Sequence, residues 1–99
     1  MLKELKYKIR EGVVLETICG KSILIATCEA RKHCPYFSEL NESSLFVWKE
    51  LQKQHNFTQI QENISAVYGI SVEEASAILL RYMNTMKKAG YIEMEDVTL

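Results

Sequence analysis

The chain of 99 residues lacks a charge excess, a long apolar run and a signal peptide. It has twelve basic and thirteen acidic residues. Proteins that bind nucleic acid mainly through its phosphates usually have an excess of basic residues. No apolar run approaches the ~20 residues of a membrane-spanning helix. The first six residues, MLKELK, contain too many charges for the apolar part of a signal peptide. We therefore expect a cytoplasmic protein that binds neither nucleic acid nor a membrane.

Cysteine is also scarce, and its odd number argues against a disulfide framework in a chain without an export signal. Cys28, His33 and Cys34, joined by Cys19, form an alternative metal-binding set. Their spacing lacks the paired C-x2-C units of zinc sites, and the adjacent His33 and Cys34 are poorly placed to hold one ion. We favour reduced thiols, with no metal and no cofactor.

The sequence also shows no recognisable set of catalytic residues. The chain has two histidines, three scattered cysteines and no glycine-rich phosphate-binding loop. A chain of this length forms one domain with a modest core, here residues 1–99, and is too small for a two-domain enzyme cleft. We therefore expect a protein that is not an enzyme and has no catalytic residues.

Residues 6–40 have a mainly strand-like pattern. Two runs rich in β-branched residues, 13–19 and 22–28, flank Gly20-Lys21, which predicts a hairpin with a two-residue loop. Residues 29–35 are polar and predict a loop. Tyr36–Leu40 predicts a third, short strand, and Pro35 in front of it suits the edge of a sheet because proline has no N–H to donate.

A strand-to-helix corner follows at Leu40. Asn41 is a favourable N-cap, and Glu42 suits the positive end of the helix dipole. Apolar residues then recur at helical spacing and predict a first helix over residues 42–53. These apolar residues are Leu45, Phe46, Trp48 and Leu51, with Trp48 as an anchor between helix and sheet.

Two more helices complete the pattern. Thr58 with Gln61 predicts a capping box for the second helix, with Ile60, Ile64 and Val67 as its apolar stripe and Gly69 at its end. Ser71 with Glu74 predicts a second capping box, and the third helix then spans Val72–Ala89 and ends at Gly90. Its apolar face comprises Ala75, Ile78, Leu79, Tyr82, Met83 and Met86. Beyond it we expect a short extended piece at Tyr91–Glu93 and a frayed end at Met94–Leu99.

This order predicts an α+β, winged helix-turn-helix-like fold, in which a three-stranded antiparallel sheet is followed by a three-helix bundle. A winged-helix DNA-binding transcriptional regulator is therefore one functional hypothesis, with Ser71–Arg81 at the start of its recognition helix. Glu73 and Glu74 disfavour it, because their carboxylates would repel the DNA phosphates.

The chain resembles the PqqD family, named after pyrroloquinoline-quinone biosynthesis protein D. The resemblance runs from about Val13 to Glu93, and no family signature covers residues 29–35. The matching residues are Gly20-Lys21-Ser22-Ile23-Leu24-Ile25, Leu40-Asn41-Glu42-Ser43, Phe46-Val47-Trp48-Lys49-Glu50-Leu51, Ile60, Ile64, Tyr68-Gly69-Ile70, Glu73-Glu74-Ala75 and Met86-Lys87-Lys88-Ala89-Gly90-Tyr91-Ile92.

The resemblance implies a recognition element for ribosomally made, post-translationally modified peptides. Such a protein binds the leader segment of a precursor peptide and presents the precursor to a modifying enzyme, often a radical S-adenosylmethionine (SAM) protein. It works as a peptide chaperone in pyrroloquinoline quinone (PQQ) synthesis or in another peptide pathway. The leader adds as an extra strand to the third strand and lies beside the third helix.

The residues themselves agree with that role, because an edge strand offers unpaired backbone groups to an extended peptide. The candidate peptide-binding residues are Tyr36, Phe37, Ser38, Glu39, Leu40, Leu79, Tyr82, Met83, Met86 and Lys87. Arg81, Lys87 and Lys88 are candidates to pair with acidic leader residues. Two alternatives stay open: the apolar helix residues belong to the core, and the edge strand pairs in a homodimer.

Overall fold

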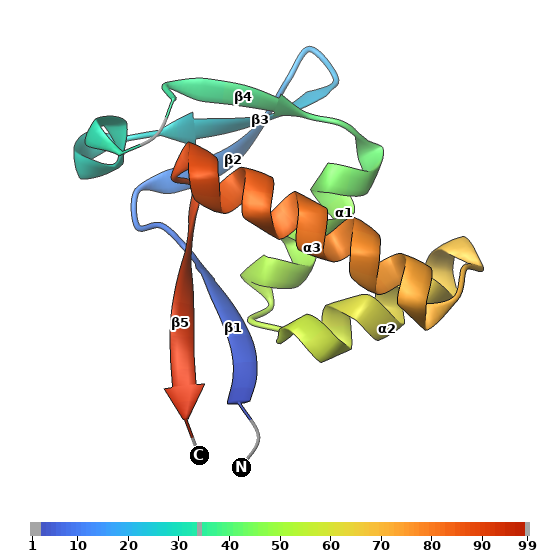
Figure 1. The fold of residues 1–99 in the computed structure, drawn as a ribbon. Helices are drawn as coiled ribbons and strands as arrows, with labels where there is room; N and C mark the ends of the chain where they lie inside the picture. Colours follow the sequence, from blue (N-terminus) through green and yellow to red (C-terminus); the bar gives the residue numbers. More distant parts are fainter. Residues whose placement is uncertain (1–2, 34, 99) are drawn as a thin grey trace.

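The computed structural model describes residues 3–33 and 35–98, with side chains for residues 6–33 and 35–94. It confirms the α+β class: antiparallel strands followed by three helices, with a further strand at the C-terminus (Figure 1). The elements are β1 (Lys3–Ile9), β2 (Val13–Ile18), β3 (Lys21–Ala26), a 3-10 helix η1 (Cys28–Lys32), β4 (Phe37–Leu40), α1 (Glu42–Gln52), α2 (Phe57–Tyr68), α3 (Val72–Ala89) and β5 (Ile92–Thr98).

The strands form two separate sheets. β2, β3 and β4 make a three-stranded antiparallel sheet in that order, and the helices lie on one side of it in Figure 1. β1 and β5 form a two-stranded ribbon that points away from this sheet and brings the two termini together.

The β1–β5 ribbon corrects the prediction for both ends of the chain. The sequence analysis predicted no separate strand before residue 13, but the structure has β1 there. It also predicted a frayed end from residue 94 onward, whereas residues 94–98 belong to β5. Pairing explains the difference: Lys3 lies opposite Thr98 and Ile9 opposite Ile92, so each strand satisfies the backbone groups of the other. This partner is distant in sequence, and local pattern does not reveal it. Leu99, the last residue of the predicted frayed end, lies outside the described residues.

The hairpin between β2 and β3 forms as predicted, but its loop is Cys19-Gly20 and not Gly20-Lys21. Both loop residues have positive φ, 52° for Cys19 and 76° for Gly20. A two-residue turn of type I′ requires this conformation at both positions, and it matches the twist of the strands. Lys21 is therefore free to begin β3, opposite Ile18.

The predicted loop between the second and third strands contains η1. Arg31 of this short helix places its guanidinium 4.6 Å from the centre of the Tyr36 ring and donates a 3.0 Å hydrogen bond to the Tyr36 hydroxyl. β4 itself begins at Phe37, one residue later than predicted. Tyr36 still belongs to the ladder, because its carbonyl accepts a 2.8 Å hydrogen bond from the Ala26 N–H.

The helix caps are mostly those that the sequence predicts. The Asn41 side chain accepts a hydrogen bond from the Ser44 N–H, and the Ser71 side chain accepts one from the Glu74 N–H. Gly69 and Gly90 end α2 and α3 in the left-handed conformation. α1 stops at Gln52, one residue before the predicted end.

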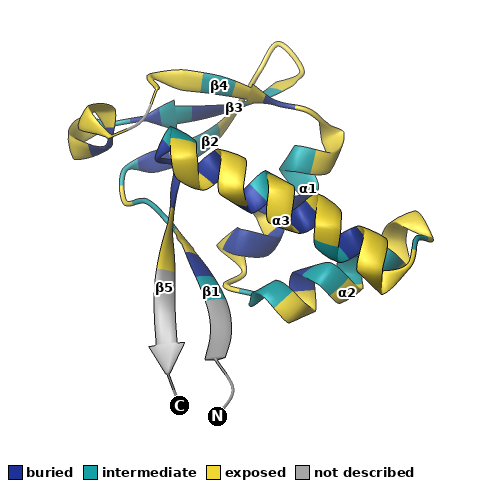
Figure 2. Ribbon diagram, viewed as in Figure 1, coloured by how far each residue is buried: buried dark blue, intermediate teal, exposed yellow. Residues whose placement is uncertain are grey.

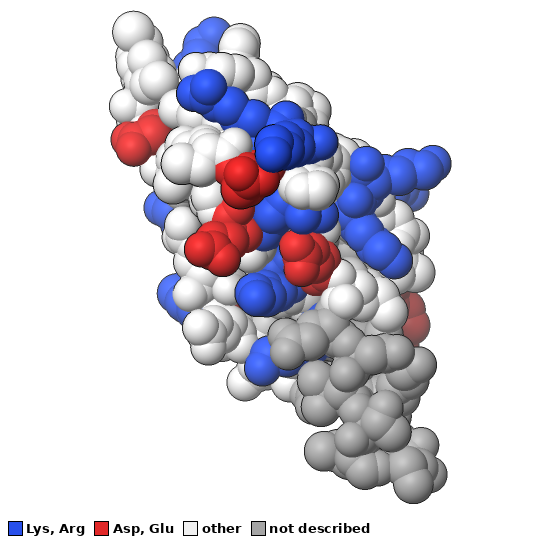
Figure 3. All heavy atoms as spheres, turned by 90° about the vertical axis from the view of Figure 1, so that its left-hand side faces the viewer, with Lys and Arg blue, Asp and Glu red and all other residues white. Residues whose placement is uncertain are grey.

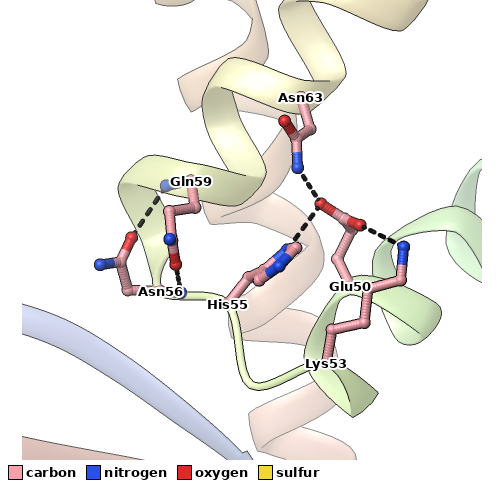
Figure 4. Close-up of polar contacts among 6 residues, drawn as sticks. All are labelled: Glu50, Lys53, His55, Asn56, Gln59 and Asn63. Carbon is pink, nitrogen blue, oxygen red and sulfur yellow. Dashed lines mark hydrogen bonds and ion pairs between the residues drawn. The ribbon is translucent and has the colours of Figure 1, made fainter.

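The predicted cap of α2 is wrong. Asn56, not Thr58, is the N-cap, and its side chain accepts a 2.8 Å hydrogen bond from the Gln59 N–H. The Gln59 side chain accepts a 2.9 Å hydrogen bond from the Asn56 N–H, which completes a capping box two residues earlier than expected (Figure 4). Both pairs have capping-box spacing, and asparagine is the stronger N-cap.

The core lies between the three-stranded sheet and the helices, and Figure 2 shows α3 alternating between buried and exposed positions. Trp48 is 1% exposed, which confirms its role as a core anchor. Val67 and Ile78 were wrongly predicted to face the core, because both are exposed in the structure. The fully buried large side chains are Trp48, Tyr91, Leu24, Ile60, Leu79, Met83 and Ile92.

A polar cluster joins α1 to α2 around Glu50, which is only 4% exposed (Figure 4). Its carboxylate accepts a hydrogen bond from Asn63 of α2 and lies 3.2 Å from Nδ1 of His55 in the connecting turn. Lys53 Nζ lies 3.5 Å from its other oxygen. Burial would raise the pKa of Glu50, but the hydrogen bonds from Asn63 and His55 and the charges of His55 and Lys53 lower it below its ordinary value.

Candidate functional site

One edge of the three-stranded sheet is available to a further strand. β4 is paired with β3 on one side, and no strand of the described residues pairs with its other side. Tyr36 is hydrogen-bonded to Ala26, and the register continues with Ser38 opposite Leu24. Because backbone groups alternate in an antiparallel ladder, those of Phe37 and Glu39 point to the outer edge.

The C-terminal half of α3 lies alongside this edge strand. The Tyr82 hydroxyl donates a 3.2 Å hydrogen bond to the carbonyl of Ser44 in the first turn of α1, the helix that follows β4. The Tyr91 hydroxyl, just beyond the end of α3, donates a 3.0 Å hydrogen bond to the carbonyl of Pro35, just before β4. Residues 82–91 therefore run in roughly the opposite direction to β4, with one hydrogen bond to the segment before it and one to the start of α1 after it (Figure 1).

The Tyr82 attachment does not depend on pH near neutrality. Burial raises the pKa of the Tyr82 phenol above its ordinary value of 10.0. The phenol therefore stays protonated and continues to donate its hydrogen bond to Ser44.

The predicted residues of β4 lie together along the edge. Tyr36 and Phe37 are 57% and 65% exposed, which is unusual for large aromatic side chains. Glu39 is also exposed, with a carboxylate oxygen 3.8 Å from Lys21 Nζ. Ser38 is half-buried and Leu40 is buried, so these two side chains face the inside of the sheet.

The predicted residues of α3 are divided between the core and the surface. Leu79, Met83 and Met86 are buried, so in this structure they belong to the core and do not form an exposed binding surface. Tyr82 is half-buried and Lys87 is exposed. These residues were chosen for their apolar helical spacing, which is also the spacing of residues that face the core. Such spacing does not distinguish a core side chain from one at the edge of the buried face.

Helix geometry shows which side of α3 the charged residues occupy. At 3.6 residues per turn, Thr85 lies on the flank of α3 that carries Ile78 and Tyr82, while Arg81 and Lys88 lie next to Thr85 on the side that points away from the core. Lys87 lies on the other flank, near Leu80. Lys88 is therefore better placed than Lys87 to reach a peptide beside β4, and Thr85 is a rim residue that the sequence analysis missed.

Basic side chains form the exposed surface of this part of α3. Arg81, Lys87 and Lys88, with Asn84 and Thr85, line a shallow hollow on it. In Figure 3 basic side chains project at the right-hand margin, the side on which α3 lies. A bound acidic side chain would be attracted to this surface.

An apolar cavity of about 260 Å³ adjoins the same region between α1, α2 and α3. Tyr82 and Ser44, which attach α3 near the end of β4, both contribute to its wall. No charged residue lines it; the remaining lining residues are Ser43, Phe46, Val47, Ile64, Tyr68, Ile70 and Ile78.

Among the described side chains, those of residues 6–33 and 35–94, there is no group of three His, Cys, Asp or Glu that could hold a metal ion. Cys19 and Cys28 are free and exposed, and Cys34 of the alternative metal set lies outside the described residues. None of the helices in the described part of the chain has the length and apolar character of a membrane span.

Comparison with known proteins identifies the family. A family model described as Coenzyme PQQ synthesis protein D (PqqD) matches residues 36–92, from the edge strand through the start of β5. The hairpin at residues 13–28, part of the resemblance seen in the sequence, lies outside this match. No curated protein and no solved structure matches the chain. Because the family match covers more than half of the sequence, the chain belongs to the PqqD family of non-catalytic peptide-binding chaperones, as the resemblance predicted.

Proposed function

We propose that this protein binds the leader segment of a ribosomally made precursor peptide as an added strand on β4. The single observation that carries the proposal is the edge of β4, which has α3 alongside it and outward-pointing backbone groups at Phe37 and Glu39. An extended peptide satisfies such groups by hydrogen bonding, which gives affinity without requiring one particular sequence.

Side chains beside the edge supply selectivity. In an added strand alternate side chains point to the α3 side, toward the flank with Tyr82, Thr85 and Ala89. Arg81 and Lys88, on the solvent side next to this flank, favour acidic leader residues. We therefore propose a leader that combines an extended segment with acidic side chains near the C-terminal half of α3.

The function of this binding is to present the precursor to a modifying enzyme. Family membership implies a peptide and a modifying enzyme as partners in general. We propose more narrowly that the enzyme is a radical SAM protein, in PQQ synthesis or a related peptide pathway, and that binding takes place in the cytoplasm.

Replacement of Glu39 by proline tests the added strand directly. Proline removes the N–H that points to the free edge and leaves the ladder between β4 and β3 intact. The loss of one hydrogen bond, about 1–1.5 kcal/mol, raises the Kd for the leader peptide about tenfold. The measurement is isothermal titration with a synthetic leader of the precursor encoded beside the gene.

Glu39→Ala is the matched control. It removes the same carboxylate and the same contact with Lys21 but keeps the N–H, so the Kd should change less than about threefold. Equal affinities of the proline and alanine variants would rule out strand addition at this edge.

The winged-helix alternative receives no support from the surface of α3. Glu73 and Glu74 are exposed in its first turn, where a recognition helix presents its base-reading residues. Salt-dependent binding to duplex DNA in a fluorescence anisotropy assay would restore this alternative.

A further inference from the structure

The outer face of the three-stranded sheet, opposite the helices, carries more apolar side chains than a solvent-facing sheet usually does. Alternation along the strands places the buried Val13, Leu24 and Ala26 on the inner face. Five of the eight outward positions are apolar. These eight positions are Val14, Glu16, Ile18, Lys21, Ile23, Ile25, Phe37 and Glu39.

The strand register gathers these side chains into rows. Val14 lies opposite Ile25, and Ile25 lies opposite Phe37, so one apolar row crosses all three strands. Val14 is 40% exposed, and Phe37 is the most exposed of the large apolar side chains described. In the next row Ile23 lies between Glu16 and Glu39.

This composition differs from that of an antiparallel sheet with one face in water, whose outward positions are mainly polar. Exposed apolar groups that adjoin one another, with charges at their border, mark surfaces that contact another protein. The two glutamates make the border acidic, although Lys21 lies close to one of them. A complementary surface therefore has an apolar centre flanked by lysine or arginine.

The outer face is continuous with the peptide-binding edge, because Phe37 and Glu39 belong to both. A peptide added to β4 extends the sheet by one strand, and its alternate side chains join the outer face beside Phe37. Peptide binding thus enlarges this face and changes its chemistry.

We propose that the outer face of the β2–β3–β4 sheet is the docking surface for the modifying enzyme, and that the bound leader completes it. The proposal rests on the proposed function and adds a second interface to it. The enzyme contacts Val14, Ile18 and Ile25 through an apolar patch, and its basic residues face Glu16. It binds the peptide-loaded protein more tightly than the empty one, because the leader strand contributes part of the contact.

A second copy of the chain is a poorer occupant of this face. Two identical faces packed together bring the acidic borders of both copies into one interface, where like charges repel.

The experiment compares two outer-face variants with one control. Val14→Ser/Ile18→Ser removes apolar side chains from β2, the strand farthest from the peptide edge, and Glu16→Lys reverses a border charge. The control is Val67→Ser, which removes an exposed apolar side chain from α2. Two dissociation constants are measured for each protein: one for the synthetic leader, and one for the purified radical enzyme encoded in the same gene neighbourhood, with and without saturating leader.

The proposal requires that both outer-face variants raise the Kd for the enzyme at least tenfold, with the Kd for the leader within twofold of the wild type. The control changes neither. For the wild type, saturating leader lowers the Kd for the enzyme. An enzyme Kd within threefold of the wild type in both outer-face variants overturns the proposal, and circular dichroism establishes that each variant is folded. If the double variant is unfolded, the Kd of Glu16→Lys for the enzyme alone decides whether the proposal holds.

Two further results are distinguishable. A wild type that binds no leader refutes the proposed function and, with it, the completed docking surface. A wild type that forms dimers in analytical ultracentrifugation, when Val14→Ser/Ile18→Ser is monomeric, assigns the face to a second copy and overturns the enzyme proposal.

Discussion

Glu50 is the one charged side chain of the described residues that the core encloses, and it holds α1 and α2 together through Asn63 and His55. Glu50→Ala leaves both partners without their acceptor, so we expect the free energy of unfolding to fall by about 2–3 kcal/mol. Urea denaturation measures the change. Glu62→Ala, at an exposed position of α2, serves as the control and should change the stability by less than about 0.5 kcal/mol. Similar losses in both variants would contradict this role of Glu50.

The same carboxylate makes stability depend on pH. The folded-state pKa of Glu50 lies below its ordinary value of 4.5, so the folded state favours the ionised form. Its contribution is therefore fully present well above pH 4.5, and it is lost as the pH falls from about 4.5 through the lowered pKa. Glu50→Gln removes this titration. We expect the wild type to lose more stability than the variant when urea denaturation at pH 6 is compared with pH 3.5, and parallel losses would contradict the assignment.

Cys19 in the β2–β3 hairpin is a residue that the turn conformation does not favour. Its φ of 52° is one that asparagine adopts readily and most other residues avoid. Asn-Gly is also the strongest sequence for this turn. Cys19→Asn should raise the free energy of unfolding by about 0.5–1 kcal/mol, and Cys19→Val should lower it, because a β-branched residue is strained there. A thermal melt of the two variants checks the opposite signs; a shift in the same direction would contradict the turn assignment.

At the scale of secondary-structure elements, the position of α3 relative to the peptide edge depends on its hydrogen bonds to the segments before and after β4. Tyr91→Phe removes the hydrogen bond to the Pro35 carbonyl from a fully buried site. We expect a loss of about 1 kcal/mol in stability and weaker leader binding, since the start of β4 is then held less firmly. The control is Tyr36→Phe, which removes an exposed hydroxyl and should cost less than about 0.5 kcal/mol. A stability loss in Tyr36→Phe as large as that in Tyr91→Phe would argue against a special role of the buried bond.

Elements were predictable where the signal is local. The caps at Asn41 and Ser71 and the left-handed glycines after α2 and α3 are set by neighbouring residues, so the helices were found with nearly correct ends. The α2 cap was missed because two overlapping capping-box patterns, Asn56 with Gln59 and Thr58 with Gln61, compete within six residues. β5 was missed because its stability comes from pairing with β1 at the other end of the chain.

At the scale of the whole molecule, the site was predictable in part. The edge strand follows from Pro35 and the short run after it, and the structure exposes Tyr36 and Phe37 along it. The apolar periodicity did not show which side of α3 faces the peptide edge. Core residues and residues next to that edge occupy adjacent rows of the same helix. Leu79 and Met83 are therefore buried, whereas Thr85 and Lys88 occupy the rim.

The outer face of the sheet also belongs to this scale. Its apolar row forms only when the three strands pair in register. The sequence alone therefore does not show that Val14, Ile25 and Phe37 lie next to one another. An enzyme face that adjoins the peptide edge would allow one small domain to hold both partners at once.

The central claim, strand addition at β4, is tested most directly by nuclear magnetic resonance (NMR) on the complex with the synthetic leader. The account predicts nuclear Overhauser contacts between leader backbone protons and the backbone protons of Phe37 and Glu39, with amide shifts at Tyr36–Leu40 and along the C-terminal half of α3. Saturable leader binding without those contacts, and without shifts at Tyr36–Leu40, would contradict it.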